Sequence, residues 1–236
     1  MFTSNWIALL ITLIIALVWL RLVDFIAGRG WIDSALSRKI IHIGTGPIFV
    51  LCWLLFNDHS DARWLAALVP LLITIQFLLV GTGVLKDEGS VKAMSRSGDR
   101  REILRGPLMY GIVFVVLTLI FWRDSPLGIT ALMILCAGDG MADVVGTRAA
   151  KTTNLPWSER KTWIGSLAMF LGGWMMCVAV LWVFNSTGFI KLEVNQLILG
   201  SGFVALVSAG VESLPFSDID NLTVPLAALC IGYLVF

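Results

Sequence analysis

Two aspartates four residues apart are the strongest candidates for chemistry in this chain. Asp139 and Asp143 lie within the segment 137–148, and residues four apart on a helix share one face. Their carboxylates could therefore reach one hard cation, such as Mg²⁺ or Mn²⁺, through oxygen ligands. A stripe of small residues beside them would let another helix or a nucleotide approach the backbone: Gly138, Ala142 and Gly146.

A second candidate group lies where a later apolar run begins. Lys161 and Thr162 precede Ser166, and a lysine followed by hydroxyls and glycine at a helix start can hold phosphate through its charge and through backbone N–H groups. The pattern GxxxxGK[ST] is absent, so this is not a Walker A loop. Alternatively, these basic residues only mark the end of a membrane span.

A third group is basic and lies at the start of another apolar run. Arg38, Lys39 and His42 are three or four residues apart, so a helix would bring them to one face. They could contact a nucleotide, or they could anchor the span at the membrane surface.

A fourth group is acidic and follows the seventh apolar run. It comprises Glu212, Asp218, Asp220 and Asn221, with no Lys or Arg among them. A second metal position or a general base would explain these acids, and a solvated acidic loop is the alternative.

Composition indicates what must position these residues. Hydrophobic residues make up 58% of the 236, charged residues 14%, and the mean hydropathy is +0.88. Ordinary soluble domains carry roughly 25% charged residues, so most of this chain is expected in lipid or against other buried helices. The net charge of +1 argues against nucleic-acid binding, and the four cysteines form no CxxC pair. A single integral membrane domain, residues 1–236, is predicted.

Eight apolar segments approach the roughly 20 residues that a bilayer core requires. They predict an all-α, polytopic bundle of about seven or eight transmembrane helices, the first being retained rather than cleaved as a signal peptide. The predicted spans are 5–23, 40–56, 64–85, 106–122, 127–147, 164–184, 195–213 and 222–236.

The basic residues predict an orientation, because Lys and Arg collect in cytoplasmic loops. Fourteen of the 17 lie in the connections after the first, third and fifth spans, and only Arg63, Arg123 and Lys191 lie elsewhere. Both termini are therefore expected outside, with all four polar groups at the cytoplasmic face. The segment 86–105 is expected to be a cytoplasmic loop with a short interfacial helix.

Four motifs in order resemble those of the phytol kinase and dolichol kinase family of polyprenol kinases, which are related to phosphatidate cytidylyltransferases. The match covers residues 37–225, and its motifs are RKIIHIG, GDGMADVVGTR, LPWSERKTWIGS and VESLPFSDIDNLTVP. The resemblance implies an all-helical membrane enzyme that uses CTP and a divalent metal, Mg²⁺, to phosphorylate a long-chain isoprenoid alcohol. Phytol, farnesol, geranylgeraniol, dolichol and diacylglycerol remain alternative substrates.

The resemblance also implies roles by matching position. Asp139 and Asp143 would lie at the metal and the nucleotide phosphates, and Lys161 would act with them in catalysis. The other nucleotide-binding candidates are Lys39, His42, Arg148, Thr162 and Ser166. Beyond the resemblance, our own mechanistic hypothesis is that the lipid hydroxyl attacks the γ-phosphate in line and that Glu212 or Asp143 accepts its proton. Asp220 and Asn221 match the late motif without an assigned role.

Two rival functions remain open. A phosphatidate cytidylyltransferase would use the same nucleotide but release pyrophosphate and form a CDP-lipid, although the longer acidic signature near the C-terminus of those enzymes is missing here. A transporter would use the acids as an ion path, and it predicts acids near the bilayer midplane in two repeats. No repeat is visible in the sequence.

Overall fold

The computed structural model describes residues 2–95, 97–149, 153–215 and 219–236, and these residues are almost entirely helical. They form two compact units, each described here by itself. Unit 1 comprises Met1–Ile41 and Cys52–Ile120, and unit 2 comprises His42–Leu51 and Phe121–Phe236.

The predicted helical membrane architecture is confirmed. Six helices are long and apolar enough to cross a membrane: Asn5–Gly28, Ala35–Leu55, Ala62–Thr82, Arg100–Ile120, Pro126–Arg148 and Trp163–Ser186. Two shorter apolar helices, Gln196–Glu212 and Asp220–Val235, match the last two predicted segments. The sides on which the loops and termini lie, and the single domain, stay predictions.

Unit 1 is built around α3 (Ala62–Thr82) and α5 (Gly106–Ile120), with α1 (Asn5–Gly28) against α3. The N-terminal part of α2 (Ser34–Cys52) belongs to this unit, as does the short 3₁₀ helix η1 (Trp53–Leu55). Half of the large apolar side chains of α1 are exposed, as expected for a helix with one face toward lipid.

The polar segment after α3 forms two short helices in unit 1. Gly83 ends α3 in the left-handed conformation, with φ +84°, which only glycine adopts without strain. The helix α4 (Glu88–Met94) then begins at Asp87, whose carboxylate accepts a hydrogen bond from the Ser90 amide, and the 3₁₀ helix η2 (Arg100–Leu104) follows. The predicted short helix in this segment is therefore present.

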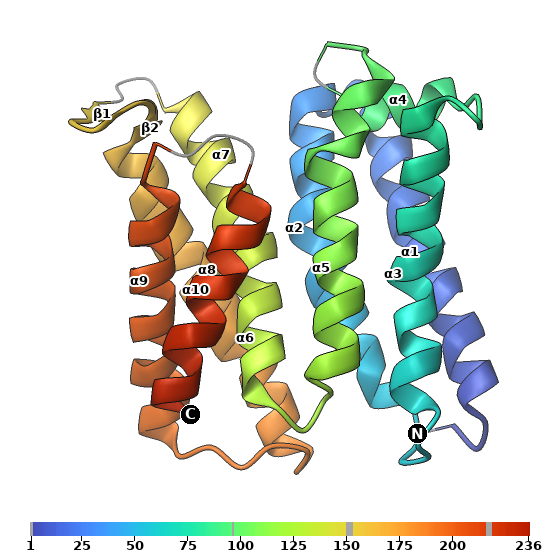
Figure 1. Ribbon diagram of the computed structural model, residues 1–236, viewed down its shortest axis with the longest axis vertical. Coiled ribbons are helices and arrows are strands. Elements are labelled where there is room, and N and C mark those ends of the chain that lie inside the picture. Colours follow the sequence, from blue (N-terminus) through green and yellow to red (C-terminus); the bar gives the residue numbers. More distant parts are fainter. Residues whose placement is uncertain (1, 96, 150–152, 216–218) are drawn as a thin grey trace. The chain divides into compact units, whose positions relative to one another are not determined.

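Unit 2 contains a long buried helix, called the central helix below, against which the other helices of the unit pack. This helix runs through α6 (Pro126–Met133), a π-helical turn η3 (Ile134–Gly138) and α7 (Asp139–Arg148), and its segments α6 and α7 are labelled in Figure 1. Within it, residues 129–137 are at most 1% exposed. Around it pack α8 (Trp163–Ser186), α9 (Ser201–Glu212) with its preceding π turn η4 (Gln196–Gly200), and α10 (Asp220–Val235).

A small β-hairpin precedes α8, and the sequence did not predict it. Strand β1 (Asn154–Leu155) pairs antiparallel with β2 (Ser158–Thr162). The hairpin is fastened to the bundle, because the indole of Trp157 donates a hydrogen bond of 2.9 Å to the carbonyl oxygen of Ser213. Thr162 ends β2 and caps α8, since its hydroxyl accepts a hydrogen bond of 3.1 Å from the Gly165 amide.

Candidate active site

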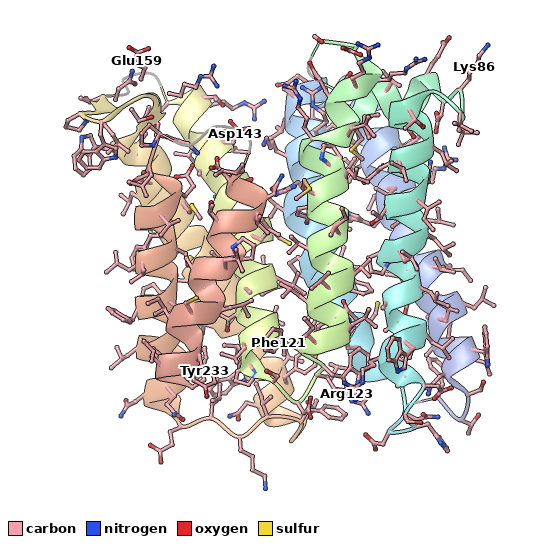
Figure 2. The ribbon with its side chains drawn as sticks, in the orientation of Figure 1. Lys86, Phe121, Arg123, Asp143, Glu159 and Tyr233 are labelled. Carbon is pink, nitrogen blue, oxygen red and sulfur yellow. The ribbon has the colours of Figure 1, made fainter. Side chains whose placement is uncertain are left out.

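The polar end of unit 2 gathers residues from four parts of the chain. Figure 2 shows Asp143 and Glu159 at this end and Arg123 at the opposite end of the same unit. The central helix supplies Asp139, the hairpin supplies Lys161, and the ends of α9 and α10 supply Glu212 and Asp220. Side chains from three helices and one strand therefore meet at one end of unit 2.

Asp139 is the first residue of α7 and follows the π turn directly. Nε2 of His42, from the part of α2 that belongs to unit 2, lies 3.4 Å from Oδ2 of Asp139 and 3.3 Å from the carbonyl oxygen of Leu135. Both neighbours are acceptors, so Nε2 of this imidazole carries the hydrogen. His42 thereby holds the start of α7 against α2.

Lys161 joins the other two acids of the cluster. Its Nζ donates a hydrogen bond to Oε1 of Glu212 and another, of 2.8 Å, to Oδ2 of Asp220. Glu212 is only 3% exposed, and an unpaired charge buried to that extent would be costly. Lys161 therefore provides the charge compensation that Glu212 requires in this arrangement.

The ammonium of Lys161 stays protonated at ordinary pH. Burial by itself would lower the pKa of Lys161, but the charges and hydrogen bonds of Glu212 and Asp220 outweigh burial and raise the pKa above its usual 10.5.

Three carboxylates could together hold a metal ion. One oxygen from each of Asp139, Glu212 and Asp220 lies within 4.8 Å of the other two. Three points that are at most 4.8 Å apart always fit within a circle whose radius is 4.8 Å divided by the square root of three. The centre of that circle therefore lies within about 2.8 Å of all three oxygens. Mg²⁺ requires oxygens at about 2.0–2.1 Å, so inward side-chain movements of under 1 Å would complete this part of its coordination shell.

The sequence predicted a different pair of metal ligands, Asp139 with Asp143. Among the described residues, the metal-capable group contains Asp139 but not Asp143, which is half-buried one helical turn further along α7. Asp220, which the sequence placed in an acidic group that could supply a second metal position, is part of the group. The predicted role of Asp143 at the metal stays a prediction.

The stripe of small residues on the central helix packs against α8. A Cβ atom at Gly165 would lie 3.2 Å from the carbonyl oxygen of Ala142, and one at Gly146 would lie 3.5 Å from Cα of Gly165. Such close backbones leave no room for side chains between the helices. This contact fixes the start of α8, and hence Lys161, beside the end of the central helix.

The remaining predicted site residues lie nearby or in the other unit. Arg148 is exposed at the end of α7, and Asn221 is half-buried in the first turn of α10. The Ser166 hydroxyl, one turn into α8, is buried and has no hydrogen-bond partner among the described residues. Lys39 lies in the part of α2 that belongs to unit 1, and Asp218 lies outside the described residues.

Arg38 contributes to a separate polar surface within unit 1. Its guanidinium donates a hydrogen bond of 2.6 Å to the carbonyl oxygen of Ser95. Together with residues of 85–88 and 97–101 it lines an open cavity of about 880 Å³. This cavity holds acids and bases in similar numbers, so its charge favours neither cations nor anions.

Comparison with known proteins identifies relatives over nearly the whole chain. The sequence is 44% identical over 224 residues to a probable phytol kinase 3, chloroplastic, of Glycine max, covering 94% of this chain and 70% of that protein. It is 46% identical to a probable phytol kinase 2, chloroplastic, of Oryza sativa subsp. japonica (94% and 73% covered) and 42% identical to a farnesol kinase, chloroplastic, of Arabidopsis thaliana (96% and 74% covered). No family model and no solved structure matches the chain.

Proposed function

The chain belongs to the phytol kinase family of lipid-alcohol kinases, and from this we propose that it transfers the γ-phosphate of CTP to the hydroxyl of a long-chain isoprenoid alcohol. The relatives are named for phytol and farnesol, and both classes of alcohol are proposed as substrates here. The reaction takes place at the membrane face that carries the basic connections, predicted to be cytoplasmic.

The convergence of Asp139, Glu212 and Asp220 on one point is the observation that carries this proposal. Phosphoryl transfer depends mostly on positioning and charge neutralisation, and hard carboxylate ligands suit Mg²⁺. When bound there, Mg²⁺ would supply positive charge to the phosphate oxygens.

The chain's own residues supply the remaining steps of the proposed mechanism. In this mechanism Arg148, at the end of α7, and the buried Ser166 hydroxyl, one turn into α8, contact the nucleotide. The lipid hydroxyl forms a bond to the γ-phosphorus as the bond to the β-phosphate oxygen breaks, and CDP leaves. Asp143 accepts the hydroxyl proton, because Glu212 is one of the three carboxylates that would hold the metal ion.

The lipid tail requires an apolar surface beside the carboxylates. Ile219 and Leu222, on either side of Asp220, are 46% and 41% exposed. Leu226, one turn further along α10, is 49% exposed. An isoprenoid chain lying along this side of α10 would stay in the bilayer while its hydroxyl reaches the site.

A membrane assay with γ-labelled CTP tests the proposal. Membranes that contain the protein, Mg²⁺ and one alcohol of a panel should form a labelled lipid phosphate, and Asp139→Asn should lose this product. Asp124→Asn is the matched control, because Asp124 is exposed in the loop beside Arg123, at the end of unit 2 opposite the site. Label released as pyrophosphate with a CDP-lipid formed from phosphatidic acid would replace the kinase by a cytidylyltransferase. Labelled ATP, GTP and UTP in parallel test the choice of nucleotide.

A further inference from the structure

The position of Lys161 suggests a role beyond phosphate binding, and the reasoning rests on the proposed metal-dependent kinase. Two of the three carboxylates that could hold the metal, Glu212 and Asp220, already accept hydrogen bonds from its Nζ. A metal ion would need lone pairs on the same two carboxylates, at distances shorter than those of the ammonium. The ammonium and the metal ion therefore compete for these ligands.

We infer that Lys161 is an exchangeable placeholder for the divalent cation. Its ammonium holds Glu212 and Asp220 together, beside Asp139, before the metal ion binds, and turns to the nucleotide phosphates when metal and nucleotide bind. This assigns to one side chain the maintenance of the site before binding and the holding of the phosphates after it.

The charges of the cluster support such an exchange. When all three carboxylates are ionised they carry a charge of −3, of which the Lys161 ammonium offsets one unit, so a divalent ion would add favourable positive charge. Once that ion is present, the carboxylates no longer attract a further cation strongly. The phosphates of the nucleotide bring new negative charge, so the ammonium gains by moving toward them.

The local structure confines the movement to one side chain. Thr162, the next residue, is buried and caps α8, so the backbone beside Lys161 is anchored. The Lys161 side chain is 21% exposed, whereas that of Glu212 is 4% exposed. A flexible four-carbon stem at the edge of the cluster can therefore turn while the carboxylates stay in place.

A consequence follows for binding in solution. Without nucleotide the ammonium opposes the metal ion, and with nucleotide it has another anionic partner. Metal and nucleotide must therefore strengthen each other's binding, by equal factors, because coupling between two ligands is reciprocal. Lys161 contributes to this coupling, in addition to the direct attraction between the metal ion and the phosphates.

Mn²⁺ binding to the purified protein in detergent, followed by electron paramagnetic resonance, tests the inference without any phosphoryl transfer. Wild type should bind Mn²⁺ weakly alone and more tightly with CTP. Lys161→Met removes the charge and keeps the length of the side chain, so it should bind Mn²⁺ about tenfold more tightly without nucleotide, within the usual range of coupling between sites. The added effect of CTP should shrink correspondingly.

Two further variants keep the test decisive. Arg160→Met removes the same charge from an exposed neighbour on the same strand and should leave Mn²⁺ affinity unchanged. Lys161→Arg keeps the charge, so it should bind Mn²⁺ no more tightly than wild type even if Lys161→Met does not fold. Unchanged or weaker Mn²⁺ binding in Lys161→Met, equal gains in Arg160→Met, or a gain in Lys161→Arg would each overturn the inference. Loss of the kinase proposal would appear separately, as absence of a labelled lipid phosphate from wild type.

Discussion

Replacement of single carboxylates can decide which acids hold the metal. The geometry predicts that Glu212→Gln and Asp220→Asn raise the Mg²⁺ concentration needed for half-maximal phosphoryl transfer as strongly as Asp139→Asn does. Asp143→Asn should have a much smaller effect. These changes keep the shape of each side chain and remove only its charge.

The expected magnitudes follow from distance. Each of the three grouped oxygens lies within about 2.8 Å of a common point, so each supplies a direct ligand there. Even residues that only support metal ligands typically contribute 10–100-fold to metal affinity, so loss of a direct ligand should cost about 100-fold or more, about 2.7 kcal/mol. Asp143 is four residues, and thus roughly 6 Å, along α7 from Asp139. At that distance, in a water-like dielectric, its charge acts on a divalent ion with about 1.4 kcal/mol, or tenfold.

The assay is the rate of lipid phosphate formation in membranes as a function of Mg²⁺ concentration at saturating CTP. Thermal unfolding of each purified variant separates loss of metal binding from loss of fold. A large increase in the Mg²⁺ requirement for Asp143→Asn, together with no increase for Glu212→Gln and Asp220→Asn, would refute the three-carboxylate site and favour the pair Asp139 and Asp143.

Three further outcomes are expected. Gly165→Val places a branched side chain against the backbone of the central helix, so it should lower the free energy of unfolding, measured by thermal unfolding, by about 1–3 kcal/mol. Gly210→Ala should leave it unchanged, because Gly210 has open space around it. The pKa of Lys161 is raised, so the stability from its ion pairs is fully present below pH 10.5 and is lost only as pH rises through the higher pKa of the folded protein. The difference in melting temperature between wild type and Lys161→Met should therefore be constant from pH 7 to 9. Trp157→Phe removes the hydrogen bond to Ser213, costing about 1 kcal/mol, and should make the hairpin more sensitive to limited proteolysis.

The helices could be predicted from sequence because lipid requires a long apolar run for every span. Each of the eight apolar segments corresponds to a helix of the structure. The start of α8 could also be predicted, because threonine is a favoured residue just before a helix. In the structure Thr162 is that capping residue. Hydropathy carries this information residue by residue, without any knowledge of tertiary contacts.

The grouping of the acids could not be predicted, because it depends on how distant helix ends meet. Spacing along one helix suggested Asp143 as the partner of Asp139, whereas the chain brings Glu212 and Asp220 to it from two other helices. The hairpin was also missed, because β1 has only two residues and its fastening through Trp157 is a tertiary contact. A short polar strand between two spans has no periodicity that distinguishes it from a loop.

The π turn of the central helix separates its apolar, packed part from the polar part that carries Asp139. A π turn holds one residue more than an α-helical turn, which shifts the angular register of the following residues by about 100°. The apolar half is set by packing among α8, α9 and α10, and the polar half must direct Asp139 toward Glu212 and Asp220. Deleting one residue within Ile134–Gly138 would join the halves into a regular helix, so that either the buried face or the carboxylate would point the wrong way. The extra residue therefore rotates the polar part of the helix relative to the apolar part, so that the apolar part can face its packing neighbours while Asp139 faces the other carboxylates.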